Sequence, residues 1–330
     1  MKFDVIIPTC NRRESINSFT EQILKCNPAP ENIIVVDSSD TKNQKLLNDE
    51  NIIYIFSKRK NQPYQRLLGS KYAESEILIY FDDDLNIVNN SIFSTIINTY
   101  KLDSNIVGVS VGINYKSSIG SNFEDSIVSP NSTLARMLFR LSGVPNVKPG
   151  RINRLGMVGG LLNVNGEVDY FNGPCMSFKK DIVHKIIPFD LLSLYERKLG
   201  KGEDKAISMS ARKFGKLFNN AEIFLEHPEN ESNYFNSIFS FVRRSTYSRL
   251  YLSKIYAEVF NKSLFLEIIA YNWFIFCRIL IASFSLVINY SSIRKEKLKG
   301  LLAALKLSVL LKQNKKKLTP EINWEIELSS

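Results

Sequence analysis

Three consecutive carboxylates, Asp82, Asp83 and Asp84, are the side chains in this sequence whose type and position best suit chemistry. They follow the apolar run 77–81, which is typical of a strand buried on both faces. Because unpaired buried charges are costly, the acids must emerge at the carboxyl end of that strand, where open α/β sheets bind ligands. Side chains alternate along a strand, so we expect Asp82 and Asp84 to share one side and Asp83 to face away.

Two converging carboxylates at such an edge form a site for a hard divalent cation, Mg²⁺ or Mn²⁺, usually completed by phosphate oxygens. A solvated acidic turn, which is common at strand ends, explains the tripeptide equally well. Asp37 ends another apolar run, although it could simply be a strand-end cap. Acids that end two strands on one edge of a sheet favour the functional interpretation.

The elements that position these acids alternate along the first part of the chain. Apolar runs predict strands at 3–8, 33–37, 52–56, 77–81 and 106–111, and helical spacing predicts helices at 13–26, 63–73 and 91–100. Strands that are apolar on both faces and alternate with helices predict a parallel, doubly wound α/β sheet with right-handed crossovers. Farther on we predict strands at 168–179 and 221–225, helices at 181–187 and 206–214, and an insertion or lid at 114–166 with one helical run, 134–141.

Composition restricts the class of protein. The 330 residues are 44% hydrophobic and 23% charged, as in a folded protein that could form one large domain or two. A net charge of +10 indicates an anionic partner: nucleic acid, an acidic membrane or a phosphorylated ligand. The four cysteines are scattered, which argues against a structural zinc site and fits a reducing compartment. The amino terminus enters a strand pattern directly, without a signal peptide, so we expect a cytoplasmic protein.

Two common nucleotide-binding motifs are missing from the sequence. No Gly-x-Gly-x-x-Gly follows the first strand, and no Gly-Lys-Ser/Thr of a P-loop occurs. An NAD-dependent dehydrogenase and a P-loop NTPase are therefore disfavoured. A nucleotide would have to be held by side chains and a metal rather than by a glycine-rich cradle.

Several short motifs, taken in order, resemble those of the nucleotide-sugar glycosyltransferases of family 2, which have the GT-A fold. They are the stretch 5–9 with Asn11 and Arg12, the run 35–37, Gln65-Arg66 with Gly69 and Ala73, Asp82-Asp83-Asp84, the glycine loop 173–178, Gly202-Glu203-Asp204 and His227. The resemblance covers roughly the first 230 residues. No Gln-x-x-Arg-Trp motif is present, so a single-addition transferase is favoured over a processive polysaccharide synthase.

The resemblance implies a reaction in which a nucleoside diphosphate is displaced from the anomeric carbon of a sugar with inversion. Asp84 would hold Mn²⁺ or Mg²⁺, with Asp82 near the ribose or a metal-bound water and neutral His227 as a further ligand. Judged alone, a histidine beside a proline is more typical of a solvated loop. The metal would neutralise the charge that grows on the leaving diphosphate.

The resemblance also assigns the remaining site residues. Asp204 takes the position of the general base that activates the acceptor hydroxyl, and Glu203 supports it or contacts the acceptor. Without the aspartate triplet, two acids before a helix would simply favour the positive end of its dipole. Arg66, taken alone, would be a surface helix residue. The resemblance places the nucleotide sugar against Pro8, Thr9, Asn11, Asp37, Arg66, Asp82, Asp83 and Gly173.

The last hundred residues differ in composition from the rest. Basic and aromatic residues are interleaved after residue 236, and the run 264–288 is nearly all apolar, broken by Glu267, Asn272 and Arg278. That run could span a bilayer by length, but Arg278 near its middle would cost about 2.5–3.5 kcal/mol, and basic residues on both sides oppose the positive-inside rule. We therefore expect helices that lie on an anionic membrane surface. A helical bundle that closes the core, or a dimer interface, is the next interpretation, and a true span is the third.

Together these features predict a GT-A catalytic domain at 1–235, with a nucleotide-binding half at 1–112 and an acceptor half at 113–235, followed by a helical, membrane-associating region at 236–330. We expect an inverting glycosyltransferase, peripheral on the inner face of the plasma membrane, that moves a sugar from a nucleoside-diphosphate sugar to a glycan or lipid-linked acceptor of a surface polysaccharide. A homo-oligomer is compatible with this prediction, whereas nucleic acid is not an expected partner because no recognition motif accompanies the basic residues. The alternatives are a metal-dependent nucleotidyltransferase and a non-catalytic membrane-surface binding protein with a degenerate transferase domain.

Overall fold

The structure, a computed structural model, describes residues 1–115, 140–142, 147–160, 162–228, 237–313 and 324. The predicted insertion or lid at 114–166 falls largely outside this described part, and so does the helical run 134–141 except for its last two residues. Within the described part, strands and helices follow one another up to residue 227, and long helices follow from residue 238.

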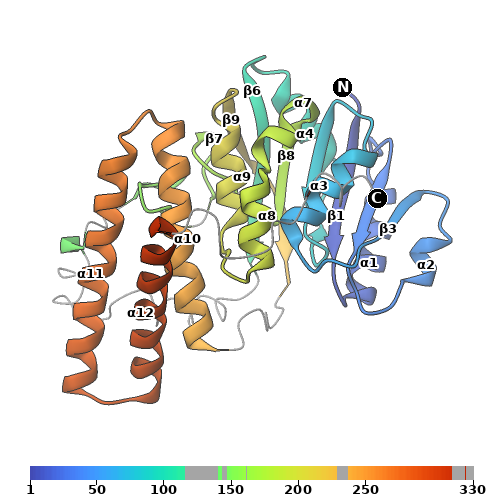
Figure 1. The fold of residues 1–330 in the computed structure, drawn as a ribbon. Helices are drawn as coiled ribbons and strands as arrows, with labels where there is room; N and C mark the ends of the chain where they lie inside the picture. Colours follow the sequence, from blue (N-terminus) through green and yellow to red (C-terminus); the bar gives the residue numbers. More distant parts are fainter. Residues whose placement is uncertain (116–139, 143–146, 161, 229–236, 314–323, 325–330) are drawn as a thin grey trace.

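A mixed sheet forms the centre of the fold. Among the described residues it has nine strands in the order β3-β2-β1-β4-β8-β6-β9-β5, with β7 paired to β9 (Figure 1). The strands are β1 Phe3–Thr9, β2 Ile33–Asp37, β3 Ile52–Phe56, β4 Ile77–Phe81, β5 Asn86–Ile87, β6 Ile106–Tyr115, β7 Gly166–Val168, β8 Cys175–Lys179 and β9 Lys216–His227. The first four of the order, β3, β2, β1 and β4, are parallel, as the apolar runs predict. The predicted α/β class is therefore confirmed.

β8 departs from the predicted parallel arrangement, because it lies between β4 and β6 and is antiparallel to both. The single strand predicted at 168–179 is divided into β7 and β8 by a loop that contains Gly173 and Pro174, and proline lacks the N–H that a continuous ladder needs. Since β8 runs opposite to β4, Cys175 pairs with Phe81, and the loop before β8 lies at the carboxyl end of β4. The glycine loop therefore lies beside the three aspartates.

Helices cover both faces of the sheet. They are α1 Arg13–Leu24, α2 Gln44–Leu47, α3 Gln62–Tyr72, α4 Ile92–Tyr100, α7 Lys180–Ile186, α8 Phe189–Glu196 and α9 Glu203–Ala211. Alternate residues of β1 enter opposite cores: Ile6 packs in the cluster with α3, α7, α8 and α9, whereas Val5 and Ile7 pack in the cluster with α1 and α4. α3 approaches β1 closely, since a Cβ built on Gly69 would lie 2.6 Å from Ile6 Cγ2. This contact holds α3, and with it Arg66, against the sheet.

Three long helices follow the sheet, α10 Ile238–Val259, α11 Leu264–Ile288 and α12 Ser292–Gln313. Each packs against the other two, and they lie side by side at one end of the molecule (Figure 1). α10 also enters the core on the α3 side of the sheet through Leu252 and Ile255. The helical region is therefore joined to the sheet by a shared hydrophobic core.

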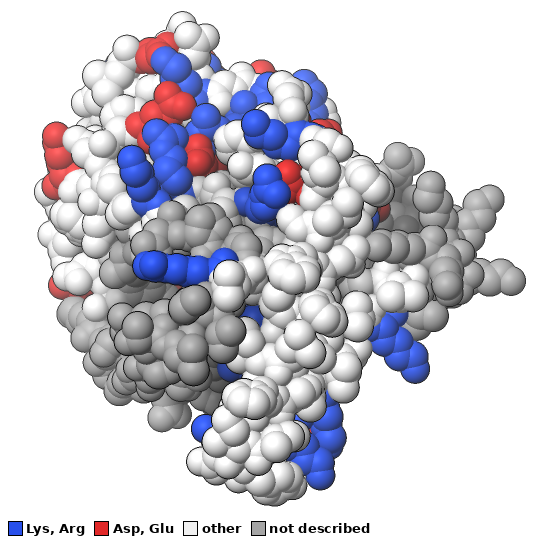
Figure 2. Space-filling model, turned by 90° about the vertical axis from the view of Figure 1, so that its left-hand side faces the viewer, with Lys and Arg blue, Asp and Glu red and all other residues white. Residues whose placement is uncertain are grey.

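α11 has two different faces. It is the one helix in the described part that is long and apolar enough to cross a membrane, with a mean hydropathy of 1.8 over an 18-residue window of which 22% is buried. Its buried face carries Tyr271, Phe274 and Glu267, whose Oε2 lies 3.3 Å from Arg154 Nε. The opposite face is apolar and exposed, and Figure 2 shows a largely uncharged surface here with basic side chains at its lower end.

Candidate active site

The three aspartates lie at the carboxyl end of β4, as predicted, but the expected alternation is not found. The strand ends before the triplet, and Asp83 and Asp84 already belong to a turn. Both carboxylates therefore reach the Arg12 guanidinium, whose Nη1 lies 3.0 Å from Asp83 Oδ1 and also contacts Asp84 Oδ2. Asp82 turns away from Arg12, and its Oδ1 accepts a hydrogen bond from Arg66 Nη2 at 3.1 Å.

The loop after β1 brings Arg12 to these acids. Thr9, at the end of β1, donates from Oγ1 to Asp83 Oδ2 at 2.5 Å. Asn11 has a left-handed backbone with φ 56°, and it exchanges hydrogen bonds with Asp40 in the loop after β2, at 2.9 and 3.0 Å. The loops that follow two neighbouring parallel strands are thereby fastened together. Burial raises the pKa of Asp83, while Thr9 and Arg12 lower it.

His227 is positioned by the end of the sheet. It is the last residue of β9, and its ring stacks on that of Tyr115, its cross-strand partner at the end of β6. Its Nδ1 lies 3.0 Å from the carbonyl oxygen of Pro228. Because a carbonyl oxygen only accepts, this contact requires a proton on Nδ1, so Nε2 carries the lone pair whenever the imidazole is neutral. Nε2 lies 3.5 Å from Asp84 Oδ1, so a nitrogen and an oxygen face each other.

Asp84 and His227 fit a divalent cation whose coordination is completed by a bound ligand. In the described part of the chain, no three His, Cys, Asp or Glu side chains are grouped closely enough to hold a metal. Asp82, the third predicted ligand, is instead paired with Arg66. Mg²⁺ is nevertheless commonly held by one or two carboxylates and completed by phosphate oxygens, and Mn²⁺ accepts similar ligands. The donor set of Asp84 and His227 therefore fits a metal bound jointly with a diphosphate.

Arg66 is fully buried on α3, beneath the acids. Its guanidinium pairs with Asp82 at 3.1 Å and with Glu203, the first residue of α9, at 3.3 Å. Its Nη2 also donates to the carbonyl oxygen of Gly173 at 3.4 Å. Burial raises the pKa of Asp82 to about 6, although Arg66 opposes this shift. Arg66 thus joins the end of β4, the glycine loop and α9.

Glu203 is held on both sides. Its Oε1 accepts from Arg66, its Oε2 accepts from the Tyr195 hydroxyl, and its own N–H donates to that hydroxyl oxygen at 3.0 Å. Gly202, directly before it, has φ 80°, a conformation that glycine adopts readily and other residues rarely do. These contacts fix the sharp entry of the chain into α9. Supporting the next residue, Asp204, is one of the two roles predicted for Glu203.

Asp204, the predicted base, is half-buried at the start of α9. Its Oδ2 accepts from the Gly173 N–H at 3.1 Å. A Cβ built on Gly173 would lie 3.6 Å from Asp204 Cβ and 3.8 Å from Asp82 Oδ2, so only this glycine separates the two acids. Burial raises the pKa of Asp204, and Glu203 adds to the shift while Lys205 opposes it. A half-buried carboxylate with a raised pKa is suited to accept a proton.

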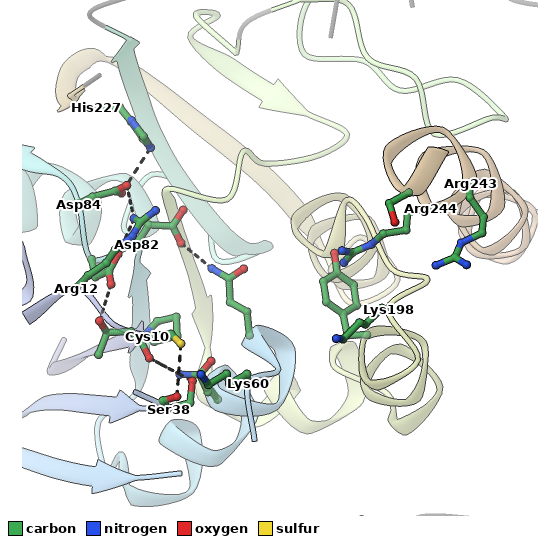
Figure 3. Close-up of a pocket in the computed structure, with 17 residues that line it drawn as sticks. Cys10, Arg12, Ser38, Lys60, Asp82, Asp84, Lys198, His227, Arg243 and Arg244 are labelled. Atoms are coloured by element: carbon green, nitrogen blue, oxygen red, sulfur yellow. Dashed lines mark hydrogen bonds and ion pairs between the residues drawn. The ribbon is translucent and has the colours of Figure 1, made fainter. Parts of the chain in front are cut away.

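Two neighbouring cavities lie at this edge of the sheet, and Thr9 lines both of them. The larger has a volume of about 720 Å³ and extends from the aspartates to side chains of α10 (Figure 3). The smaller has a volume of about 190 Å³. Asp37 lines the smaller cavity and accepts hydrogen bonds from the Tyr54 hydroxyl at 2.6 Å and the Ser39 N–H at 2.8 Å. The end of β2 is therefore part of the site.

The predicted site residues fall into three groups. Those that line the larger cavity are Pro8, Thr9, Asp82, Asp83, Asp84 and His227. Those that line the smaller cavity are Thr9, Asn11 and Asp37. Those that line neither cavity, but form one connected group next to Asp82, are Arg66, Gly173, Glu203 and Asp204. The structure thus brings all of them to one edge of the sheet, with Arg66 as a buried support.

Several cations that line the larger cavity were not predicted as site residues, namely Arg12, Lys60, Lys198, Arg243 and Arg244. Arg12 could have been found, because it follows Asn11 in the same loop. Arg243 and Arg244 belong to the region 236–330, for which the sequence predicts membrane contact. Nothing in the spacing of their sequence indicates that α10 faces the cavity.

The fold is that of nucleotide-sugar glycosyltransferases, the GT-A fold. The mannosyltransferase PcManGT from Pyrobaculum calidifontis, solved in complex with GDP-Man and Mn²⁺, is similar with a TM-score of 0.50 and 13% identity, over 96% of this chain and 88% of that chain. GalNAc-T7, solved with UDP, GalNAc and Mn²⁺, is similar with a TM-score of 0.51 and 12% identity, over 81% of this chain and 56% of that chain. At these identities the likeness shows the fold alone.

The sequence itself gives the family. The sequence profile of Glycosyl transferase family 2 matches residues 4–186, which is more than half of the chain. No curated protein matches the sequence. The chain belongs to glycosyl transferase family 2 and is a glycosyltransferase, as the resemblance of its motifs predicted.

Proposed function

We propose that this glycosyltransferase is a metal-dependent, inverting enzyme that transfers a sugar from a nucleoside-diphosphate sugar to a glycan or lipid-linked acceptor in surface-polysaccharide synthesis. The observation that carries the proposal is the pair of Asp84 and His227, whose facing oxygen and nitrogen are 3.5 Å apart at a cavity of the size that ligands occupy. The two similar structures contain GDP-Man or UDP together with Mn²⁺. Family membership favours sugar transfer over nucleotidyl transfer and over a non-catalytic binding protein.

The donor would bind along the ends of β1, β2 and β4. In this proposal the nucleoside occupies the side of the smaller cavity, where Asn11 and Asp37 lie, and the diphosphate lies beside Asp84. Asp84 and His227 would hold Mn²⁺ or Mg²⁺, which would offset the charge that grows on the leaving diphosphate. Arg12 pairs with both Asp83 and Asp84 and so holds the Asp84 carboxylate in place beside the diphosphate.

Asp204 would accept the proton of the acceptor hydroxyl while the oxygen of that hydroxyl attacks the anomeric carbon. The new glycosidic bond forms as the bond to the diphosphate breaks on the opposite face, which inverts the configuration. The raised pKa of Asp204, caused by burial, makes this carboxylate a stronger base than an exposed aspartate. Gly173 leaves room between Asp204 and Asp82, because its missing side chain would otherwise contact both.

The enzyme would lie on an anionic membrane surface through α11. Exposed apolar side chains follow helical spacing along one face of this helix: Phe265, Ile269, Trp273, Phe276, Leu280, Phe284 and Val287. The ion pair of Glu267 with Arg154 keeps the other face against the protein, which opposes a span surrounded by lipid. Basic residues at the start of α12, Arg294 and Lys295, would meet anionic headgroups.

A thermal-shift panel tests the donor site, with UDP-, GDP-, dTDP- and CMP-sugars added with and without Mn²⁺. A nucleotide at about 100 times its Kd stabilises a fold by about 2.7 kcal/mol, and we expect one base to do so only when the metal is present. Asp84→Asn should remove the metal-dependent part of the shift. Asp181→Asn, at an exposed carboxylate of α7, should retain it. A panel without any metal-dependent shift would contradict the proposal.

Asp204→Asn separates donor binding from chemistry. We expect the variant to keep the metal-dependent shift and to lose roughly 10²–10⁴-fold in the rate at which nucleoside diphosphate is released from the donor. Wild-type turnover in this variant would remove Asp204 from the role of base while leaving the donor site in place.

A further inference from the structure

Three basic side chains, Lys198, Arg243 and Arg244, line the larger cavity opposite the aspartates and are named here the basic wall. Figure 3 shows them across the cavity from Asp84 and His227. Lys198 lies just after α8, and the two arginines lie near the start of α10. The proposed sugar transfer, as described so far, assigns none of them a role.

Lys198 occupies a position that favours glycine. Its backbone is left-handed, with φ 52°, at the end of a helix where glycine is the usual residue. The turn is closed in this form by two hydrogen bonds, from the Lys198 N–H to Tyr195 O at 2.9 Å and from the Leu199 N–H to Leu194 O at 3.1 Å. No carboxylate forms an ion pair with Lys198 among the described residues. A lysine kept in a strained conformation at a cavity indicates that its charge is used.

Arg243 also has no carboxylate partner in the part of the chain that the structure describes. Its guanidinium lies over the Phe239 ring, with Cζ 5.3 Å from the centroid. Its Nε is buried and finds no hydrogen-bond acceptor among the described residues. Ser240, one turn earlier on α10, lines the same cavity and adds a hydroxyl. This face of α10 therefore presents to the cavity a hydroxyl and a guanidinium that has no carboxylate partner among the described residues.

Arg244 connects the basic wall to the loop that precedes the predicted base. Its Nε and Nη2 donate to the carbonyl oxygen of Gly200 at 3.1 and 2.9 Å. Gly200 begins the short segment that leads to Glu203 and Asp204. A ligand bound at the basic wall would therefore lie next to the loop that positions Asp204.

We propose that the basic wall binds a phosphate group carried by the acceptor, an inference that rests on the proposed function. The cations on the donor side are already matched, since Arg12 pairs with Asp83 and Asp84 and Lys60 pairs with Asp40 at 2.6 Å. The donor diphosphate belongs on that side, with the metal. The Arg243 guanidinium and the Lys198 ammonium on the opposite side match the charge of a second phosphate.

A phosphate-bearing acceptor could come from two sources, a lipid phosphate at a membrane surface or a soluble sugar phosphate. The test uses the full-length protein with the donor site filled by Mn²⁺ and the nucleoside diphosphate that the thermal-shift panel identifies. Farnesyl phosphate and glucose 1-phosphate are titrated beside their phosphate-free counterparts, farnesol and methyl glucoside. We expect one phosphate probe to bind at least roughly tenfold more tightly than its counterpart, and the identity of that probe assigns the source. Equal affinities within both pairs would overturn the inference.

Lys198→Gly separates this role from folding, because glycine relieves the left-handed backbone. The variant should have an unchanged or higher Tm, yet bind the phosphate probe roughly tenfold more weakly. Arg243→Gln should weaken binding to a similar extent, whereas Lys254→Gln, exposed farther along α10, should not. Variants of Lys198 and Arg243 that bind the probe like wild type would overturn the inference. If the wild-type protein shows no metal-dependent thermal shift with any nucleotide, that result would instead contradict the proposed function.

Discussion

Glu203 and Asp204 are neighbours in the first turn of α9, but the structure gives them different surroundings. Glu203 is occupied by Arg66 and Tyr195. Asp204 is half-buried, and its carboxylate accepts hydrogen bonds from the backbone N–H groups of Gly173 and Lys205. The Glu203 charge raises the pKa of Asp204, in addition to the larger effect of burial. The charge of Glu203 thus makes the Asp204 carboxylate a stronger base.

This difference predicts how activity depends on pH. A base works only when ionised, so activity falls as the pH drops through its pKa, and the raised pKa of Asp204 places this acid limb above the ordinary aspartate value of about 3.9. Glu203→Gln removes a negative charge, lowers the pKa of Asp204 and should move the acid limb of kcat/KM to lower pH. The exposed control Asp181→Asn should leave it in place. A limb that stays fixed, or rises, in Glu203→Gln would exclude this coupling.

Sequence reasoning singled out the acids that the structure brings to one edge of the sheet, but it did not predict the contacts that hold them there. The triplet after β4 and the acids before α9 stand out because carboxylates directly follow an apolar run or begin a helix. The pairing of Arg12 with Asp83 and Asp84 depends on how two distant loops meet, and no local pattern reports such a contact. The side chains of the triplet do not alternate as expected, because β4 ends at Phe81, directly before Asp82.

At the scale of elements, α3 is set against β1 by a missing side chain. A Cβ on Gly69 would lie 2.6 Å from Ile6 Cγ2 and 3.1 Å from Val36 Cγ2, and both atoms belong to stiff, β-branched side chains in buried strands. The close approach brings Arg66, on the same helix, within reach of Asp82 and Glu203. The close spacing between α3 and β1 therefore determines whether Arg66 can reach Asp82 and Glu203.

Gly69→Ala should reverse the usual effect of this substitution. In an exposed helix, alanine is about 1 kcal/mol more favourable than glycine. At Gly69 the added methyl group overpacks the core, and we expect the free energy of unfolding to fall by about 1–3 kcal/mol. Chemical denaturation measures the change, with the exposed Lys71→Ala on the same helix as a control that should stay within about 0.5 kcal/mol of wild type. A more stable Gly69→Ala protein would disprove the close packing.

The strands were easier to predict than the way they pair. The ranges 33–37, 52–56 and 77–81 were predicted residue for residue, because continuous β-branched and aromatic runs mark buried parallel strands. The reversed direction of β8 could not be predicted, because orientation depends on the path of a long connection rather than on side-chain type. That reversal is what brings Gly173 beside Asp82.

At the scale of the whole molecule, the first of the three carboxyl-terminal helices, α10, shares a hydrophobic core with the sheet, and α11 and α12 pack against α10. We propose the catalytic domain at 1–235 and the membrane-associating region at 236–330, but packing crosses this division through Leu252 and Ile255 of α10. The apolar run 264–288 was predicted with the bounds that α11 has, because its composition is extreme. That α10 faces the cavity could not be predicted, since its basic residues show no distinct spacing.

Membrane association through α11 predicts preferential binding to anionic vesicles. Phe265 and Phe284 are 71% and 65% exposed, and burying a phenylalanine is worth about 1.5–3 kcal/mol. The double variant Phe265→Ser/Phe284→Ser should therefore bind at least roughly tenfold more weakly in a vesicle-sedimentation assay, and high salt should weaken wild-type binding. Leu102→Ser, at a side chain 70% exposed beyond α4, is the matched control and should bind like wild type. Wild-type protein that ignores vesicles, or binds neutral and anionic ones alike, would contradict the prediction.

The contacts of Ser248 have a consequence for how this enzyme can be shortened or recombined. Its Oγ accepts from the Lys201 N–H at 2.7 Å and donates to Leu199 O at 3.0 Å, while Leu252, one turn later, lies 3.8 Å from a Cβ built on Gly202. The loop that leads to Asp204, the proposed base, is thus supported from α10. If the proposed function holds, exchanging the helical tail for that of another family member would also exchange part of the acceptor side of the active site, and the choice of acceptor would change with the tail.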